Sequence, residues 1–303
     1  MKSTLQSRRQ FQKLAGAAAC GTAFGPALLS ASPEEQVDRR VFAMSDLHIG
    51  KIADGRDGAE WLQLALADVT ANIPDIAYGL TLGDITQNGD VEGLDSYLGQ
   101  TRGHRIPKWF ELAGNHEYYH GNIGNYTSVV RSTAPLLHLD GNVAWFFLSD
   151  EKESRQGDLT DATLTWLKEG LAEHRNKITV VCSHQLVANT VRRSHKAAFQ
   201  LHPIDKLQEI LDSCPVDLWM CGHEHHSPYA KDKIVRKNNT TFINVASMSH
   251  AYGTKGSGSV ILDFKNGARE IRVRRRDHDH HRFMKEFDMA IPLRCACKLR
   301  IHR

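Results

Sequence analysis

Ile-Ala-Tyr-Gly-Leu-Thr-Leu-Gly-Asp, residues 76–84, is the stretch of sequence that decides the fold. Its mostly apolar run has the length of a buried strand and stops at a glycine and a carboxylate. Four other apolar runs also stop directly before a polar motif: residues 41–45, 108–113, 178–183 and 217–221. In open α/β sheets, ligands bind at the carboxyl ends of the strands. The sequence therefore predicts five strands whose motifs share one rim.

The five motifs carry metal-ligating side chains. They are Asp46-Leu47-His48, Gly83-Asp84, Gly114-Asn115-His116-Glu117, His184 and Gly222-His223-Glu224-His225. Carboxylate, amide and imidazole groups suit divalent metals between hard and borderline, and the lack of cysteine argues against a structural zinc site. Two carboxylates against two divalent ions leave a positive site, which suits a phosphate ester better than a neutral amide or a glycoside. Two metals ~3.5–4 Å apart can clamp the oxygens of an in-line displacement.

This order of motifs resembles the calcineurin-like metallophosphoesterase family: D-x-H, G-D, G-N-H-[D/E], a lone H, then G-H-x-H. The resemblance covers roughly residues 41–273. It implies one metal ion held by Asp46, His48 and His225. It implies a second ion held by Asn115, His184 and His223, with Asp84 bridging the two. The ions would be divalent or trivalent Mn, Fe or Zn, with a bridging hydroxide as the nucleophile.

The same resemblance implies that His116 is a catalytic residue and not a ligand. Imidazole titrates near neutral pH, so His116 can steady the phosphoryl oxygens and protonate the leaving group. If the backbone is extended there, its side chain points away from that of Asn115. Many relatives carry an acid at the position of Gln87, which can pair with the catalytic histidine. A neutral amide can orient an imidazole but cannot stabilise its charged form as well.

The remaining pattern predicts an α/β fold, a two-sheet β-sandwich flanked by helices in an αββα arrangement. Helices are expected over residues 59–72, 161–174 and 203–213, and a hairpin over residues 136–149. Closing strands are expected over residues 242–246, 259–264 and 270–274. The metallophosphoesterase domain is assigned to residues 38–276, and a basic, His-rich tail to residues 277–303. The run of residues 278–281 imitates a metal cluster, but we expect a solvated tail.

The amino terminus predicts export. Ser7-Arg8-Arg9-Gln10-Phe11-Gln12-Lys13 precedes a small, apolar stretch, and this motif resembles a twin-arginine signal peptide over residues 1–31. The twin-arginine translocation machinery is then a partner, and the protein is periplasmic or extracellular. The apolar stretch is short and glycine-rich, so no stable transmembrane helix is expected in the mature protein. An uncleaved signal or lipidation at Cys20 would tether it to the membrane.

Charge and cysteine usage narrow the class further. The net charge is +3, but residues 1–31 carry +4 and residues 269–303 carry +6, which leaves −7 for residues 32–268. An acidic body argues against a broad nucleic-acid surface. Cys182 and Cys221 end predicted strands and are expected to be small buried residues, and five cysteines after the signal give no disulfide framework.

Other histidines and one basic segment leave alternatives open. His226 and His250 are candidates for lining the pocket, whereas the other histidines outside the motifs are expected to be surface residues or hydrogen-bonded core residues. The segment of residues 185–201 contains Arg192, Arg193, His195 and Lys196. It can meet a second phosphate or an acidic part of the substrate, or it can be a solvated helix.

These features predict an exported, dinuclear-metal-dependent phosphoesterase of small phosphate esters. A phosphatase for monoesters and a phosphodiesterase both remain open. One alternative is a nuclease of the same family, against which the export signal counts. Another is a non-catalytic surface binding protein on this fold, against which the complete ligand set and His116 count.

Overall fold

The computed structural model describes residues 37–149, 157–231 and 234–300. The chain divides into two units, residues 1–35 and residues 36–303, and the fold below is that of the second unit. The predicted signal peptide, with Arg8, Arg9 and Cys20, lies outside the described residues. So does the end of the predicted tail from residue 301.

Two mixed sheets form the centre of this unit. The first has the order β12-β11-β10-β1-β2-β3, with β13 beside β11. Its strands are β1 (Arg39–Met44), β2 (Ile76–Leu82), β3 (Trp109–Leu112), β10 (Gly258–Phe264), β11 (Glu270–Asp277), β12 (Arg282–Phe283) and β13 (Met289–Pro292). The second has the order β4-β5-β6-β7-β9-β8. Its strands are β4 (Leu136–Asp140), β5 (Val143–Leu148), β6 (Ile178–Ser183), β7 (Leu218–Cys221), β8 (Ile234–Lys237) and β9 (Thr240–Asn244).

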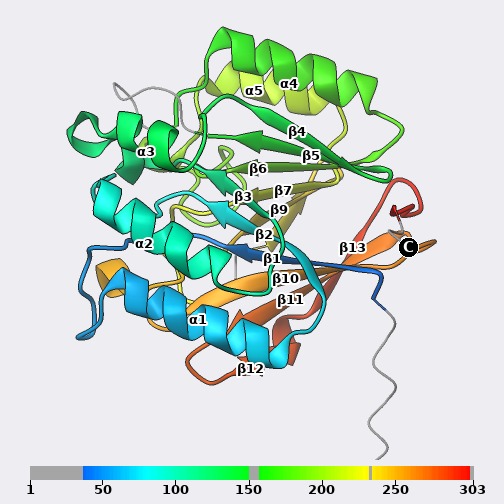
Figure 1. Cartoon of the computed structure of the whole chain (residues 1–303). Coiled ribbons are helices and arrows are strands. Elements are labelled where there is room, and N and C mark those ends of the chain that lie inside the picture. Colours follow the sequence, from blue (N-terminus) through cyan, green and yellow to red (C-terminus); the bar gives the residue numbers. More distant parts are fainter. Residues whose placement is uncertain (1–36, 150–156, 232–233, 301–303) are drawn as a thin grey trace, which may run out of the picture. The chain divides into compact units, whose positions relative to one another are not determined.

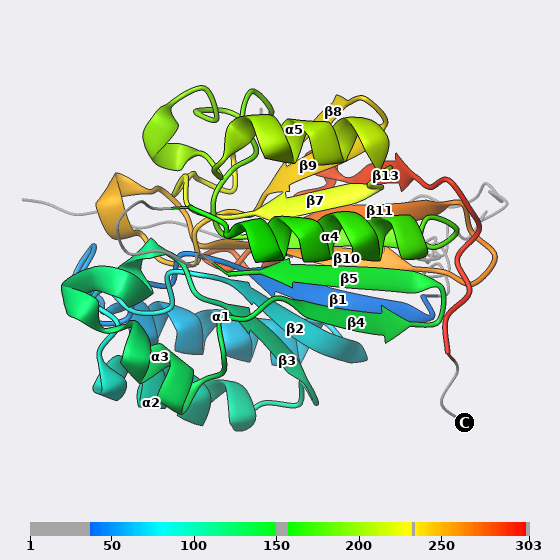
Figure 2. The same ribbon diagram turned by 90° about the horizontal axis from the view of Figure 1, so that it is seen from above.

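Helices cover the outer face of each sheet, as Figures 1 and 2 show. The first sheet is covered by α1 (Gly58–Asn72), α2 (Val91–Arg102) and α3 (Ile123–Val129), and the second by α4 (Asp161–Glu173) and α5 (Ile204–Ser213). Four 3-10 helices occupy connections: Asn115–Gly121, Ala197–Phe199, Ala251–Gly253 and Lys285–Phe287. The predicted two-sheet sandwich flanked by helices is therefore confirmed.

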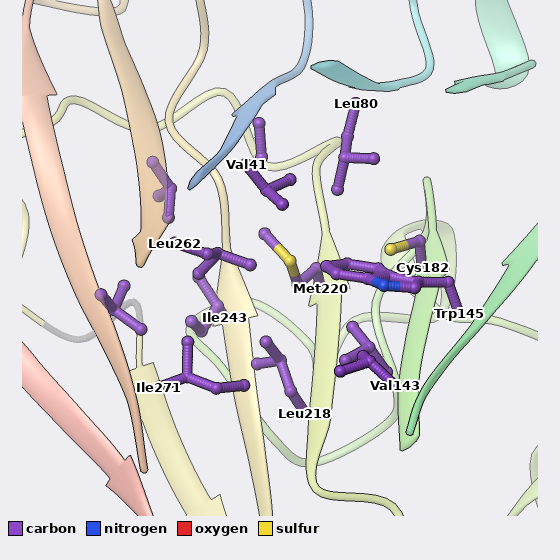
Figure 3. Close-up of a cluster of buried hydrophobic side chains, with 14 of the residues drawn as sticks. Val41, Leu80, Val143, Trp145, Cys182, Leu218, Met220, Ile243, Leu262 and Ile271 are labelled. Atoms are coloured by element: carbon purple, nitrogen blue, oxygen red, sulfur yellow. The ribbon is translucent and has the colours of Figure 1, made fainter. Parts of the chain in front are cut away.

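The core between the sheets takes alternate residues from the strands of both. Val41 and Leu80 from the first sheet face Trp145 and Met220 from the second, and all four are buried (Figure 3). Burying each such side chain contributes roughly 1.5–3 kcal/mol. This packing fixes how the two sheets lie against each other, and with it the distance between motifs that come from different sheets.

The C-terminal stretch differs from the prediction. Residues 277–300 are not a solvated tail, because β12 and β13 both pair with β11. Ile291, Leu293 and Cys297 are buried in the core between the sheets. The prediction was wrong because apolar side chains spaced along a basic stretch still seal the edge of the first sheet.

Two histidines of the His-rich run contact one buried carboxylate of helix α1. Asp68 accepts two hydrogen bonds from the Arg276 guanidinium, at 2.8 and 2.6 Å. Nδ1 of His278 and Nδ1 of His281 lie 2.8 and 2.9 Å from the same carboxylate. These four residues are called the Asp68 cluster below. Among the described residues, the run 278–281 belongs to no group with metal-binding geometry.

Candidate metal centre

The five motifs meet at one rim, as the sequence predicted. Strands β2, β6 and β7 end directly before a motif, and β1 and β3 end one residue earlier. Main-chain hydrogen bonds join the loops that follow. The Leu47 amide donates to the Asp84 carbonyl at 2.9 Å, and the Gly222 amide donates to the His184 carbonyl at 3.0 Å. Main-chain hydrogen bonds therefore join the motif loops after β1 and β2 in the first sheet and those after β6 and β7 in the second.

Two groups of metal-ligating side chains come together there. The first contains Asp46, His48, Asp84 and His225, and the second contains Asp84, His184 and His223. In each group the ligand atoms all lie within 4.8 Å of one another. Asp84 belongs to both groups, which is the arrangement expected of a bridging carboxylate. The amide oxygen of Asn115 lies 3.2 Å from Nε2 of His184, so Asn115 joins the second group.

The donor atoms fit metal ions because electron-pair donors face one another. His184 donates Nδ1–H to the Leu82 carbonyl at 2.7 Å, which leaves its Nε2 as an acceptor. That Nε2 faces Oδ2 of Asp84 at 3.2 Å, and this carboxylate oxygen is buried without a hydrogen-bond partner. Nε2 of His48 lies 3.0 Å from Nε2 of His225, so at most one of these two nitrogens carries a proton toward the other. A cation at each place satisfies both donors, and such a hydrogen bond behind an imidazole is typical of a ligand.

Most of the rim residues adopt a backbone conformation that L-residues avoid. The φ angles of Asp46, His48 and Asp84 are 56°, 51° and 51°, and those of His223 and His225 are 68° and 51°. Non-glycine residues in this left-handed region store strain, which clusters at functional sites. Strands β1, β2 and β7 thus turn sharply after they end, and the turns aim their side chains into the rim. The sequence pattern does not reveal this conformation.

Glu117 holds two of the motif loops together. Its buried carboxylate accepts hydrogen bonds from the main-chain amides of Asp84 (3.0 Å), Gly114 (2.8 Å) and Thr86 (3.0 Å). A Cβ at Gly114 would collide with the Asp84 carboxylate, which explains the glycine. Glu117 therefore positions the bridging Asp84 against Asn115 and is not itself in either ligand group.

The comparison that decides the family is with the calcineurin-like phosphoesterases, whose model matches residues 39–227. The chain belongs to this family. The predicted family membership is confirmed, and it places the chain among phosphoesterase hydrolases with a metallophosphoesterase fold.

Curated relatives of this phosphoesterase include human tartrate-resistant acid phosphatase type 5. The two are 24% identical over 212 residues, which cover 60% of this chain and 63% of the human protein. An uncharacterized protein of Mycobacterium tuberculosis is 29% identical over 212 residues, which cover 59% of this chain and 40% of that protein. The chain therefore spans less than two thirds of the relatives that it matches.

A solved structure similar to the phosphoesterase is that of a purple acid phosphatase from yellow lupin seeds. The TM-score is 0.59 at 14% identity, and the match covers 88% of this chain and 57% of that one. At this identity the likeness concerns the fold alone.

In this phosphoesterase, His116 lies beside the ligand groups but is oriented differently from the prediction. Asn115 and His116 begin a 3-10 helix, so the condition of an extended backbone is not met. Nδ1 of His116 donates to the main-chain carbonyl of Gln87 at 2.8 Å, and its Nε2 lies 3.9 Å from Oδ2 of Asp84. The Gln87 amide donates instead to the phenol of Tyr252 at 2.8 Å. The main chain at position 87 therefore orients His116, and the side chain does not.

Charges in the rim are strongly coupled. Burial alone would raise the pKa of Asp46, but the neighbouring His225 outweighs it and lowers that pKa to about 2. Burial would lower the pKa of His225, but Asp46 raises it to about 9. For Asp84, burial is outweighed by His184 and His116, and its pKa is well below the usual range. Burial and the neighbouring His184 lower the pKa of His223 to about 3, so it is a neutral donor at pH 7.

A pocket of about 720 Å³ opens over the rim, a size typical of small-molecule sites. Asn115, His116, His223 and His225 line it, and so does the candidate His226. His250 does not line it: its ring stacks on Trp61, and its two nitrogens contact Asp54 and Asp279. Pocket residues to which the sequence analysis gave no individual role include Tyr119, Phe199, Glu224, Tyr252 and Lys255. Two of them lie in stretches that the sequence did single out, Glu224 in the last motif and Phe199 in the basic segment of residues 185–201.

Proposed function

We propose that this chain is an exported phosphoesterase that hydrolyses small phosphomonoesters or phosphodiesters at a two-metal centre. The observation that carries the proposal is the sharing of Asp84 between the two ligand groups. Asp46, His48 and His225 would hold one ion with Asp84, and Asn115, His184 and His223 would hold the other. The identity of the ions is drawn from Mn, Fe and Zn, which take such nitrogen and oxygen ligands.

Bound ions would supply Lewis acidity for the phosphoryl oxygens and an activated water as nucleophile. The protein supplies the other parts of the reaction. His116 is 5% exposed and faces the pocket, so Nε2 can donate a proton to the leaving oxygen of an ester. The Gln87 carbonyl fixes the ring through Nδ1, so the proton that moves is the one on Nε2. Glu117 holds the loops of Asp84 and Asn115 in a fixed relative position through its hydrogen bonds to the Asp84 and Gly114 amides.

Phosphatase activity has a second support in the human relative, which is named as an acid phosphatase. The pocket over the rim is also of small-molecule size, and this favours a small ester over a nucleic acid.

The test of the hydrolytic proposal begins with metal analysis of the purified protein. The protein is then stripped with a chelator and reloaded with Mn, Fe or Zn, singly and in pairs. Turnover is measured on aryl and alkyl phosphomonoesters, phosphodiesters and nucleotides. About two ions per chain and activity that returns only on reloading are expected. Full activity of the stripped protein would refute the proposal.

Export in folded form is the second part of the proposal. It rests on the motif of residues 7–13, and the folded protein would acquire its ions before translocation. Among the helices that the structure describes, none has the length and apolar character to cross a bilayer. Changing Arg8 and Arg9 together to Lys should leave the precursor in the cytoplasm, because the guanidinium pair is read and not bare charge. Normal export of this variant in cell fractionation would refute it, and Lys2→Arg is the control.

A further inference from the structure

The pocket over the metal rim extends beyond the predicted ligands to a wall of basic side chains. Arg192, Arg193 and Lys255 line this part of the pocket, and they are called the cationic wall below. The pocket is far larger than a phosphoryl group, so the rest of the substrate must lie against residues other than the ligands. The wall is the charged part of that additional surface.

A buried carboxylate holds the two arginines in place. Oε1 of Glu224 lies 3.6 Å from Nε of Arg192 and 3.8 Å from Nε of Arg193. Glu224 is 2% exposed, whereas the arginine side chains are 50% and 44% exposed. One carboxylate lies against two guanidinium groups, so these three residues carry a net positive charge. Their exposed ends are available to an anion in the pocket.

The cationic wall is adjacent to the rim. Glu224 lies between the ligands His223 and His225 in the chain, so its carboxylate ties the arginines to the same loop. The ring of Phe199 lies 4.9 Å from the ring of His223, and the Arg193 guanidinium lies 5.7 Å from the centre of the Phe199 ring. Phe199 therefore contacts both the rim residue His223 and the wall residue Arg193, so the rim and the wall lie within one side chain of each other.

The backbone supports a fixed role for the loop. Arg193 has a left-handed φ of 60°, and the loop is closed by hydrogen bonds from the Asn189 amide to the Ser194 carbonyl and from the Gln200 amide group to the same carbonyl. His195 and Lys196 belong to the same segment but do not line the pocket. Of the four basic residues in this segment, only Arg192 and Arg193 line the pocket.

We propose that the cationic wall binds a second anionic group on the substrate, so that the enzyme prefers esters carrying a carboxylate or a second phosphate remote from the scissile bond. This inference rests on the proposed hydrolytic function for its kinetic consequence. Arginine suits the role because its guanidinium presents paired donors to the oxygens of either group.

The test uses three aryl phosphates that differ only at the far end of the ring. They are 4-(phosphonomethyl)phenyl, 4-(carboxymethyl)phenyl and 4-(carboxamidomethyl)phenyl phosphate, or their methyl diesters if the parent protein hydrolyses diesters. The carboxamide is a neutral match for the carboxylate. We expect kcat/KM for the charged esters to exceed that for the carboxamide by at least about tenfold, mostly through KM.

The variants locate the effect. The double variant Arg192→Ala/Arg193→Ala should lose the preference, because kcat/KM for the two charged esters falls to the level of the carboxamide. Lys196→Ala removes a charge from the same segment outside the pocket and should keep the preference. A parent with no preference, or a double variant that retains it, overturns the inference. The comparison between the phosphonate and the carboxylate shows which anion is favoured.

Calorimetric binding of the matching non-hydrolysable aryl phosphonates separates this inference from the proposed function. Tighter binding of the charged analogues that depends on Arg192 and Arg193 supports the wall even in a protein without turnover. Hydrolysis of all three esters together with equal binding of the analogues retains the proposed function and overturns the wall.

Discussion

Two clusters of histidine and aspartate lie at different places in this molecule, and only one has the character of a metal site. The rim contains Asp46, Asp84 and the four ligand histidines, and the Asp68 cluster contains Asp68, Arg276, His278 and His281. The central carboxylate is buried in both. In the Asp68 cluster, a guanidinium donates two hydrogen bonds to that carboxylate. At the rim, Oδ2 of Asp84 faces imidazole nitrogens and has no hydrogen-bond donor.

The difference shows where the positive charge comes from. In the Asp68 cluster, the Arg276 guanidinium supplies the positive charge at every ordinary pH. The resulting ion pair needs no further cation, and it joins helix α1 to strand β11. At the rim no arginine or lysine contacts Asp84 among the described residues, so a bound cation has to supply the positive charge, and the rim opens to a pocket. The backbones differ in the same sense, because Asp68 lies in a regular helix, whereas Asp46 and Asp84 are in left-handed turns. Residue types alone do not distinguish the two clusters; the donor geometry does.

Removing the shared carboxylate of the rim should have the largest effect. Asp84→Asn takes away the charge common to both ligand groups, and we expect turnover to fall by at least ~10³-fold, beyond the loss of a single electrostatic contact. Bound metal, measured on the same sample, should also fall. Asp68→Asn is the matched change in the other cluster and should keep the metal content. Unchanged metal content and turnover in Asp84→Asn would show that the rim is no more a metal site than the Asp68 cluster.

His116 should affect chemistry without affecting metal content. His116→Ala removes the proposed proton donor, and turnover of an alkyl ester should fall by ~10²–10⁴-fold. The loss should be small for an aryl ester such as a nitrophenyl phosphate, because its leaving group needs no proton. Rates on both esters and the metal content decide the matter. His120→Ala, an exposed histidine of the same 3-10 helix, is the control.

Equal losses on both esters would reject the acid role and leave electrostatic positioning. Lost metal would instead make His116 a structural part of the rim.

The Asp68 cluster should contribute stability and not catalysis. Asp68→Asn leaves the buried Arg276 guanidinium without its charge partner, and we expect a loss of about 3–5 kcal/mol in the free energy of unfolding. Urea unfolding measures it. Asp161→Asn breaks an exposed pair with Lys206 and should cost at most about 1 kcal/mol. Equal effects of the two substitutions would show that the buried cluster is no stronger than a surface pair.

Acid should weaken the Asp68 cluster in a predictable direction. Burial opposes the charge of Asp68, but hydrogen bonds from Arg276 and His278 outweigh it and lower its pKa. Burial lowers the pKa of His278 below 6.5, although Asp68 and Asp279 favour its charged form. Each contribution is therefore present above the ordinary pKa of the group and is lost as the pH falls toward the lowered value. The stability that depends on neutral His278 is lost below pH 6.5, and the stability that depends on charged Asp68 is lost only below pH 3.8.

The measurement is the free energy of unfolding between pH 7.5 and 4, with chelator present so that the rim holds no metal. Below about pH 6.5 the parent should lose more stability than His278→Asn, because Asn keeps a donor toward Asp68 and takes up no proton. The same pH dependence in the parent and in His278→Asn would contradict the assignment.

Local patterns in the sequence located the strands of the rim well. β2 and β6 have the predicted bounds, and β1, β3 and β7 differ by one or two residues, because an apolar run that stops at a polar motif is a local signal. Helix α2 was missed because Gly93 and Gly99 in its interior weaken the helical pattern, although Asp90 caps it. The Asp68 cluster was missed because its partners are 208 residues apart. No local pattern carries such a contact.

The hydrogen bond from His116 to the carbonyl of Gln87 determines which substitutions the site can tolerate. A substitution at position 87 replaces the side chain and leaves the carbonyl in place, so it does not remove the acceptor that sets the ring of His116. Position 87 is free to exchange an acid for an amide without releasing the imidazole. A saturation library should tolerate many residues at position 87 and few at 116. Proline at position 88, which would reshape the main chain itself, should imitate the loss of His116.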